Sequence, residues 1–500
     1  MDDPGALLRQ AVQLHQQGRL DAAATLYRRV LDAAPRQFDA LHLLGVIERQ
    51  RGNPARAAEL IGAALQVDPG QARAHCNLGA ALQDLDRPAD ALASYDAALR
   101  LDPRYALAWN NRGNALRRLG RQGEALDSYE RALAIQAGYP EAWCQRAMLL
   151  NDLGRFEEAA ASAEQASSRR PGYADALLAL GNALQGMDLP ADAVRAYDAA
   201  LAAAPRQADA WCARGAALKK SGDLAAALDS YDRALALRPD YALAAHYRAN
   251  ALRALGRRDD ARAAYHQALA LGADGNDIAF ALAALGEGAL PDAAPRDYVR
   301  ELFDGYAGRF ERHLVGQLGY RTPALLAALL SRHGVAPAPG AAWHVADLGC
   351  GTGLCAPFLR PLAARLTGVD LSPKMLERAA QTGSYDALAC AEIGDWLAGQ
   401  EHDCDLLVAA DVLVYIGALD TLFARAHAAL GPGGRFAFSC EALEGADGYA
   451  ITASNRFAHA LAYVQRCAAQ AGFVLVEAER AVLRREHGED VQGWVVLLAA

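Results

Sequence analysis

The feature that most constrains this fold is a repeat of 34 residues that fills the first half of the chain. Eight successive frames fit residues 4–275 without insertion or deletion. The twentieth position of every frame is alanine, and the eighth is always glycine or alanine. Small residues at these two positions predict pairs of closely packed antiparallel helices. One pair cannot bury its apolar face alone, so we expect neighbouring pairs to stack into a right-handed superhelix with a concave groove.

Three further positions of the frame specify the kind of repeat. Position 24 is tyrosine in six of the eight frames and position 32 is proline in six. The tyrosine is suited to fill the space between the paired helices, and the proline to stop the second helix. Tryptophan stands at the fourth position in Trp109, Trp143 and Trp211. The pattern resembles the tetratricopeptide repeat, and eight matches in register make coincidence negligible.

The resemblance implies a groove that binds a polypeptide partner. The sixth position of each frame faces this groove, and three frames carry an amide there: Asn77, Asn111 and Gln145. Such amides can hydrogen-bond a peptide backbone of any sequence, as an asparagine ladder does in related repeat proteins. The next three frames carry Ala179, Ala213 and Tyr247 at this position. The ladder therefore covers only the middle repeats.

A glycine-rich motif marks the second half of the chain. The stretch VADLGCGTG (345–353) runs from an apolar, strand-like start into an aspartate and then three glycines spaced two apart. Glycine lets the backbone turn tightly and lets a ligand approach closely. Seventeen residues after Gly353, Asp370 ends a second apolar stretch. A carboxylate at that place can accept both hydroxyls of a ribose.

Two cofactor classes compete for this motif. A dinucleotide fingerprint requires glycine or alanine where this chain has Leu354. Asp347, two residues before the first glycine, suits a ligand with an ammonium group better than one with a pyrophosphate. The motif therefore resembles motif I of the class I S-adenosylmethionine (SAM) methyltransferases. The resemblance implies SAM as the cofactor and implies these cofactor-binding residues: Asp347, Gly349, Cys350, Gly351, Gly353, Asp370, Leu371, Glu392, Ile393 and Ala410.

Two pairs of residues are candidates for the adenine contact. Related proteins usually place an acid followed by an aliphatic residue after the third strand, which favours Glu392 with Ile393. Glutamate replaces the common aspartate here, so Asp395 with Trp396 stays an alternative.

The rest of the second half alternates strands and helices. We expect strands at 344–349, 366–371, 387–393, from 404 onward and at 434–441, then two strands joined by a hairpin near residue 487. The expected fold is thus α plus α/β: an all-α repeat superhelix, then the Rossmann-like seven-stranded sheet of the class I methyltransferases. Ligands of such sheets lie at the carboxyl ends of the strands.

The methyl acceptor is harder to deduce. The stretch 409–417 lacks the Asn/Asp-Pro-Pro-Tyr motif of enzymes that methylate exocyclic amines, and no Pro-Cys nucleophile for cytosine occurs. The candidate catalytic residues are Asp411, Tyr415 and His459, the last expected on a helix. Further candidates on the acceptor side are Glu441, Arg456 and Arg484.

The segments between the two halves predict a cap, a linker and a lid. Residues 276–286 continue the helical periodicity and would cap the last repeat, residues 287–297 read as a Gly/Pro linker, and the methyltransferase domain would span 298–500. Bacterial fusions of these two domains carry a segment like LFDGYAGRFERHLV (302–315). In related enzymes the equivalent segment folds over the cofactor as a lid. The resemblance therefore implies lid helices at residues 298–330 of this chain. The lid candidates are Phe303, Tyr306 and Phe310.

Composition restricts the partners and the compartment. The net charge of −9 makes nucleic acid an unlikely partner. No stretch of about 18 large apolar residues occurs and the start is too polar for a secretory signal, which predicts no membrane association. Nine cysteines without a CxxC pair predict free thiols, a cytoplasmic location and no metal site.

Three functions fit the sequence. The first is a SAM-dependent methyltransferase whose repeats present a polypeptide substrate or partner. The second is a small-molecule methyltransferase that uses its repeats for assembly or localisation. The third is a scaffold without catalysis, against which the intact glycine motif and Asp370 count.

Overall fold

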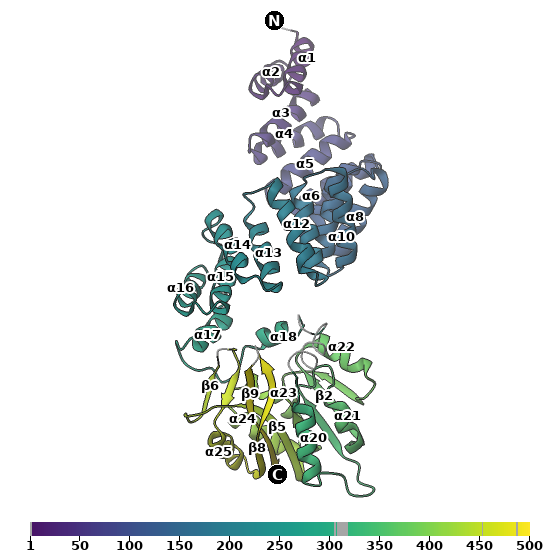
Figure 1. Ribbon diagram of the computed structural model, residues 1–500. Coiled ribbons are helices and arrows are strands. Elements are labelled where there is room, and N and C mark those ends of the chain that lie inside the picture. The colour runs from purple at the N-terminus through teal and green to yellow at the C-terminus, as the bar shows by residue number, and fades with distance from the viewer. Residues whose placement is uncertain (1–2, 305–306, 308–318, 453, 487–488) are drawn as a thin grey trace. The chain divides into compact units, whose positions relative to one another are not determined.

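The computed structural model describes residues 3–304, 307, 319–452, 454–486 and 489–500 (Figure 1). The chain divides into two compact units, residues 1–257 and 258–500.

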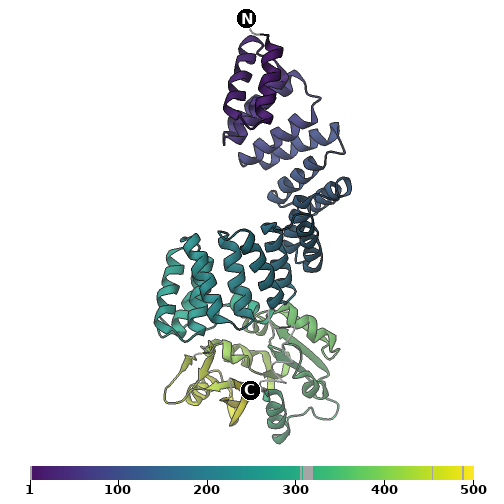
Figure 2. The same cartoon turned by 45° about the horizontal axis from the view of Figure 1, so that its top comes forward.

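The first unit consists of antiparallel helix pairs that stack on one another, coloured from purple to teal in Figure 2. The first three pairs are α1 (Pro4–Gln16) with α2 (Leu20–Ala33), α3 (Phe38–Gln50) with α4 (Pro54–Val67), and α5 (Ala72–Asp84) with α6 (Pro88–Leu101). The next three are α7 (Ala106–Arg118) with α8 (Gln122–Ile135), α9 (Pro140–Asp152) with α10 (Phe156–Arg169), and α11 (Ala174–Gly186) with α12 (Pro190–Ala203). Helices α13 (Ala208–Lys220), α14 (Leu224–Leu237) and α15 (Ala242–Ala254) complete this unit.

The paired helices touch where the frame has its small residues. A Cβ atom built on Gly79 would lie 2.6 Å from a ring carbon of Tyr95, and one on Gly181 would lie 2.3 Å from the ring of Tyr197. These distances are shorter than a carbon–carbon contact, so a side chain at either of these two glycines would push its helix pair apart. The tyrosines of position 24 are completely buried: Tyr27, Tyr95, Tyr129, Tyr197, Tyr231 and Tyr265. The packing expected from the repeat is confirmed.

The second unit is built on one mixed sheet. Its strands are β1 (His344–Leu348), β2 (Arg365–Asp370), β3 (Ala387–Cys390), β4 (Cys404–Ala409), β5 (Leu430–Ala442), β6 (Tyr449–Ile451), β7 (Phe457–His459), β8 (Val474–Glu486) and β9 (Glu489–Ala499). The strands β3-β2-β1-β4-β5 run parallel, and β9 pairs antiparallel with both β5 and β8. This order reverses direction between β1 and β4, where open α/β sheets bind their ligands.

Helices cover both faces of this sheet (Figure 1). One face carries α24 (Asp420–Ala429) and α25 (Leu461–Gln470), whose core centres on Phe423, Phe436 and Phe438. The other face carries α20 (Thr322–Arg332) and α21 (Ala356–Leu359) over Leu406 and Val408. Strand β1 is buried along its whole length between them. In the described residues of this unit, the further helices are α16 (Arg258–Ala270), α17 (Gly275–Ala284), α18 (Arg296–Asp304), α22 (Pro373–Gln381) and α23 (Ile393–Leu397), with short 3₁₀ turns at Arg360–Leu362 and Leu413–Tyr415.

The sheet confirms the predicted fold class but contains two more strands than the seven expected. Among the described residues, β6 and β7 form a short antiparallel pair, and β7 adds in parallel to the end of β5. The prediction of a helix around His459 is therefore wrong. All three residues of β7 are buried, and the helix begins only at Leu461. The local sequence around His459 is compatible with a helix as well as with a strand, and the pairing with β5 decides in favour of the strand.

Within the described parts of the chain, no helix combines the length and apolarity needed to cross a membrane.

Candidate active site

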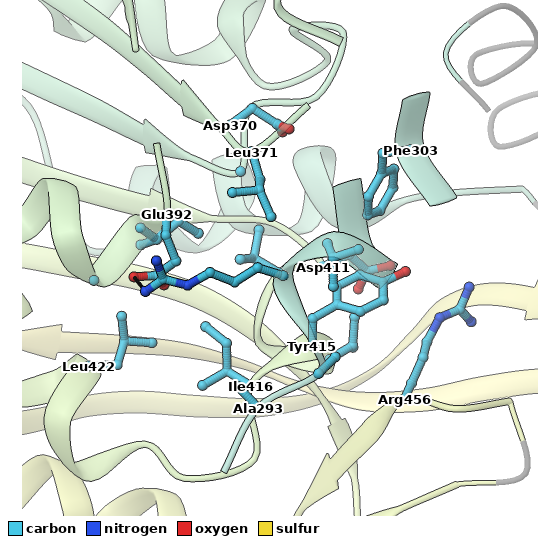
Figure 3. Close-up of a pocket in the computed structure, with 18 of the residues that line it drawn as sticks. Ala293, Phe303, Asp370, Leu371, Glu392, Asp411, Tyr415, Ile416, Leu422 and Arg456 are labelled. Atoms are coloured by element: carbon cyan, nitrogen blue, oxygen red, sulfur yellow. Dashed lines mark hydrogen bonds and ion pairs between the residues drawn. The ribbon is translucent and has the colours of Figure 1, made fainter. Parts of the chain in front are cut away.

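A pocket of about 950 Å³ opens at the carboxyl ends of the parallel strands (Figure 3). Its size suits a ligand as large as a nucleoside conjugate. Loops that follow β1, β2, β3 and β4 line it, together with α18 and residues of β8. Twelve residues singled out from the sequence meet there: Phe303, Gly349, Gly351, Asp370, Leu371, Glu392, Ile393, Ala410, Asp411, Tyr415, Arg456 and Arg484.

Asp370 joins two loops at the floor of this pocket. One carboxylate oxygen accepts a hydrogen bond from the amide of Gly351 at 2.9 Å, and the other accepts one from the amide of Ser372 at 2.8 Å. Burial raises the pKa of Asp370, while the backbone amides of Ser372, Gly351 and Leu371 oppose the rise. Each oxygen has a second lone pair, so the carboxylate can accept two further hydrogen bonds from a ligand.

The glycine loop has a conformation that other residues adopt with strain. Gly349, Gly351 and Gly353 have φ angles of +68°, +54° and +96°. A Cβ on Gly349 would lie 2.3 Å from a methyl carbon of Val412. The loop therefore needs glycine both for its turn and for its approach to the β4 loop.

Asp347 and two neighbours lie outside the pocket lining. Asp347 is 1% exposed and accepts a hydrogen bond of 2.6 Å from the hydroxyl of Tyr385. Burial raises the pKa of Asp347 to about 7. Cys350 packs with Leu376 in a small buried cluster, and Gly353 faces the ring of Tyr385. The contact between Asp347 and a ligand ammonium stays a prediction.

At the left of Figure 3, Glu392 and Leu422 bound the pocket. Glu392 caps α23, because its carboxylate accepts the amide of Asp395 at 2.9 Å. Arg296 of α18 lies 2.9 Å from Asp395 and 3.5 Å from Glu392. Ile393 lines the pocket, whereas the alternative pair of Asp395 and Trp396 does not.

At the opposite end, a group of charges closes the pocket; we call it the arginine cluster (Asp411, Glu441, Arg456, Arg484 and Glu486). All of its members except Glu441 line the pocket, and Figure 3 shows Arg456 at the right. Arg484 donates to Asp411 at 2.7 Å, to Glu486 at 2.8 Å and to Glu441. Arg456 also pairs with Glu486, and its side chain keeps 24% exposure. Each of the three acids therefore contacts a guanidinium, although the cluster holds two arginines against three acids.

Two tyrosines and the backbone of Asp411 complete this end. Burial raises the pKa of Tyr415 and of Tyr320, which also lines the pocket. Asp411 has a φ angle of +58°, a strained conformation for a non-glycine residue, and donates its amide to Ser439 at 2.9 Å. Among the lining residues, Tyr320 and Glu486 were missed as candidates from the sequence. Tyr320 stands in the YRTP tetrad (320–323), inside the range 298–330 expected for the lid helices, which was an available signal.

The geometry does not support His459 as a base. The side chain is completely buried and does not line the pocket. Its Nε2 donates to the carbonyl oxygens of Ile416 at 2.9 Å and Gly417 at 3.1 Å. Burial lowers the pKa of His459 to about 4, so the ring is neutral at pH 7. These contacts indicate a structural residue that fixes the loop after β4.

Helix α18 lies over the pocket with one of the three lid candidates. The ring of Phe303 meets Tyr415 edge-on, with centroids 5.4 Å apart and planes at 81°. Next to it, Asp304 accepts a hydrogen bond of 2.5 Å from the hydroxyl of Ser372. Tyr306 and Phe310 lie outside the described residues.

In the repeat unit, the three predicted groove amides are half-buried. The amide nitrogen of Asn77 lies 2.9 Å from Nε2 of His42, and that of Asn111 lies 3.9 Å from the sulfur of Cys76. Each asparagine thus contacts the repeat before its own.

Comparison with known proteins agrees with both units. A methyltransferase domain model matches residues 346–438, and tetratricopeptide repeat models match 8–72, 42–83, 76–140, 140–173 and 208–241. Trans-aconitate 2-methyltransferase of Paracidovorax citrulli is 40% identical over 96 residues, which are 19% of this chain and 37% of that protein. Methyltransferase-like protein 27 of Homo sapiens is 36% identical over 106 residues, 21% of this chain and 41% of that protein. The chain thus spans about two fifths, or less, of the length of these relatives.

Among solved structures, a tetratricopeptide repeat protein of Thermus thermophilus is 29% identical, with a TM-score of 0.32; the match covers 37% of this chain and 100% of that one. From the matched domain models and from the fold, we conclude that this chain is a fusion of tetratricopeptide repeats with a methyltransferase domain.

Proposed function

We propose that the second unit is a SAM-dependent methyltransferase. The observation that supports it most is the placement of Asp370. Its carboxylate ends β2 at the pocket floor, is held by two backbone amides and retains an acceptor site on each oxygen. That arrangement fits the two hydroxyls of a ribose.

The remaining walls suit the rest of SAM. The backbone of Gly349 and Gly351 permits close approach of the amino-acid portion, and Leu371 and Ile393 offer apolar surfaces to a purine. SAM supplies a methyl group that is already activated. The chain therefore has to align the acceptor with that methyl group and exclude water, and Phe303 and Tyr415 cover the pocket for this purpose.

Calorimetry of the full chain with S-adenosylhomocysteine tests this proposal. The wild type should bind in the micromolar range, and Asp370→Ala should weaken binding at least tenfold, because the ribose loses its acceptor. The matched control Asp490→Ala, at an exposed strand end, should bind like the wild type. Binding of NADH without binding of S-adenosylhomocysteine would refute the proposal.

We infer further that the acceptor atom belongs to a carboxylate. Among the described lining residues at this end, the acids Asp411 and Glu486 are paired with arginine, and these residues include no histidine. A carboxylate is ionised at pH 7 and needs no base before it attacks the methyl group. Arg456, with 24% of its side chain exposed, can pair with such a group. The names of the trans-aconitate 2-methyltransferase relatives agree with this class of acceptor.

The repeats support a polypeptide partner, and the carboxylate can belong to that partner or to a small acid. Transfer of tritiated methyl from SAM into a lysate distinguishes the two sources. Methyl esters release volatile methanol in mild base, whereas methyl groups on nitrogen or sulfur stay attached. We expect base-labile label in the protein fraction; base-labile label in the small-molecule fraction would assign the repeats to assembly. Base-stable label would contradict a carboxylate acceptor.

A further inference from the structure

The segment that precedes the catalytic sheet packs against it. Phe280 of α17 is 2% exposed, and its ring lies 5.9 Å from that of Phe457 in β7 and 5.5 Å from that of Tyr298. These rings form one buried cluster with Ala294. Helix α17 therefore buries its aromatic residue inside the second unit.

The next residues pair with the loop after β4. Ala293 forms an antiparallel bridge with Ile416, and the amide of Ala294 donates to the carbonyl of Tyr415 at 2.9 Å. In the other direction, the carbonyl of Asp292 accepts the amides of Gly417 at 2.7 Å and Ala418 at 2.9 Å. Three backbone hydrogen bonds thus fix the loop that carries Tyr415.

The same residues form part of the pocket wall. Asp292, Ala293 and Ala294 line the pocket, and Figure 3 shows Ala293 beside Ile416. Tyr415 in turn contacts Phe303 of the covering helix α18. A displacement of residues 292–294 would therefore move both the pocket wall and the contact between Tyr415 and the covering helix α18.

We infer that residues 275–294 are a positioning element of the methyltransferase site, which holds Tyr415 and Ile416 in place through Phe280 and the bridge at Ala293. The inference rests on the proposed function only for its ligand-binding readout. The site is complete only when this segment, which the sequence assigns to a repeat cap and a linker, is docked on the sheet.

Two substitutions in the full chain test the inference. Ala294→Pro removes the N–H that donates to Tyr415, and Pro295 already restricts Ala294 to extended conformations. Leu290→Pro is the matched control, because Leu290 is exposed, lies outside the pocket lining, precedes Pro291 as Ala294 precedes Pro295, and donates no backbone hydrogen bond among the described contacts. Phe280→Ala removes the aromatic anchor, and Phe280→Leu should restore most of the packing.

The first readout is hydrogen exchange of the peptide that contains Gly417 and Ala418. We expect at least tenfold faster exchange in Ala294→Pro and Phe280→Ala, and wild-type exchange in Leu290→Pro. The second readout is affinity for S-adenosylhomocysteine, which should fall about fivefold in the same two variants and recover in Phe280→Leu. Unchanged exchange in folded Ala294→Pro would overturn the inference. Failure of the wild type to bind S-adenosylhomocysteine would refute the proposed function instead. Hydrogen exchange alone would then test whether residues 275–294 position the loop that carries Tyr415.

Discussion

Asp347, near the end of β1 and just before the glycine loop, is an acid whose charged form is disfavoured by its surroundings. It is 1% exposed, and its single described side-chain partner is the hydroxyl of Tyr385. Its pKa rises from 3.8 to about 7 because burial disfavours the carboxylate. The folded chain therefore binds a proton that the unfolded chain has released. This acid should make stability fall as pH rises from about 4 to about 7 and leave it level above that.

Asp347→Asn removes this titration while it keeps an acceptor for Tyr385. The variant and the wild type should have similar free energies of unfolding at pH 5. At pH 8 the variant should be more stable by about 1 kcal/mol or more, because only the wild type holds a buried charge. Urea unfolding at the two pH values measures the difference, with Asp490→Asn as an exposed control. An equal difference at both pH values would show that Asp347 ionises normally.

Sequence reasoning works at this scale where the chemistry is local. Gly349, Gly351 and Asp370 stand at fixed spacing in one strand–loop–helix unit, so their meeting in one pocket was predictable. The arginine cluster was only partly predictable, because Arg484 reaches Asp411 across 73 positions of sequence. His459 shows where prediction from local sequence fails. Its residue type suggests a base, but its burial depends on the pairing of β7 with β5, which no local pattern specifies.

At the scale of the elements, the repeat unit depends on close contact between the helices of each pair. Gly79→Ala should destabilise it by about 1–3 kcal/mol, since the new methyl group would lie 2.6 Å from Tyr95. Gly62→Ala, in the middle of α4 with nothing within 4 Å of its Cβ position, should instead stabilise the unit by up to about 1 kcal/mol. Chemical unfolding followed by helical circular dichroism compares the two. Equal effects would mean that helix propensity, rather than the tyrosine contact, decides.

The helix pairs of the 34-residue repeat were the easiest elements to predict. Small residues at two positions of the frame determine how each helix pair packs, and the structure has these pairs at the expected places. Short strands were the hardest. Strands β6 and β7 have three residues each, which is too few to show the alternation of apolar and polar residues that predicts a strand.

At the scale of the whole molecule, the border between the units differs from the border of the repeat pattern. The pattern continues to residue 275, but the second compact unit begins at residue 258. The repeat pattern shows which residues are small or apolar, but it does not show which of the two compact units these residues contact. Phe280 and Ala294 illustrate this, because their partners Phe457 and Tyr415 lie more than 100 positions further along the chain. The division of the chain at 298 that the sequence suggests stays a prediction.

The central claim is that SAM binds at the carboxyl ends of β1 and β2 with its ribose on Asp370. A crystal structure of the full chain with S-adenosylhomocysteine tests it most directly. We predict ligand density across the loop of Gly349 and Gly351, both ribose hydroxyls within hydrogen-bonding distance of Asp370, and the purine between Leu371 and Ile393. Density for the ligand elsewhere, or a ribose that does not contact Asp370, would contradict the account.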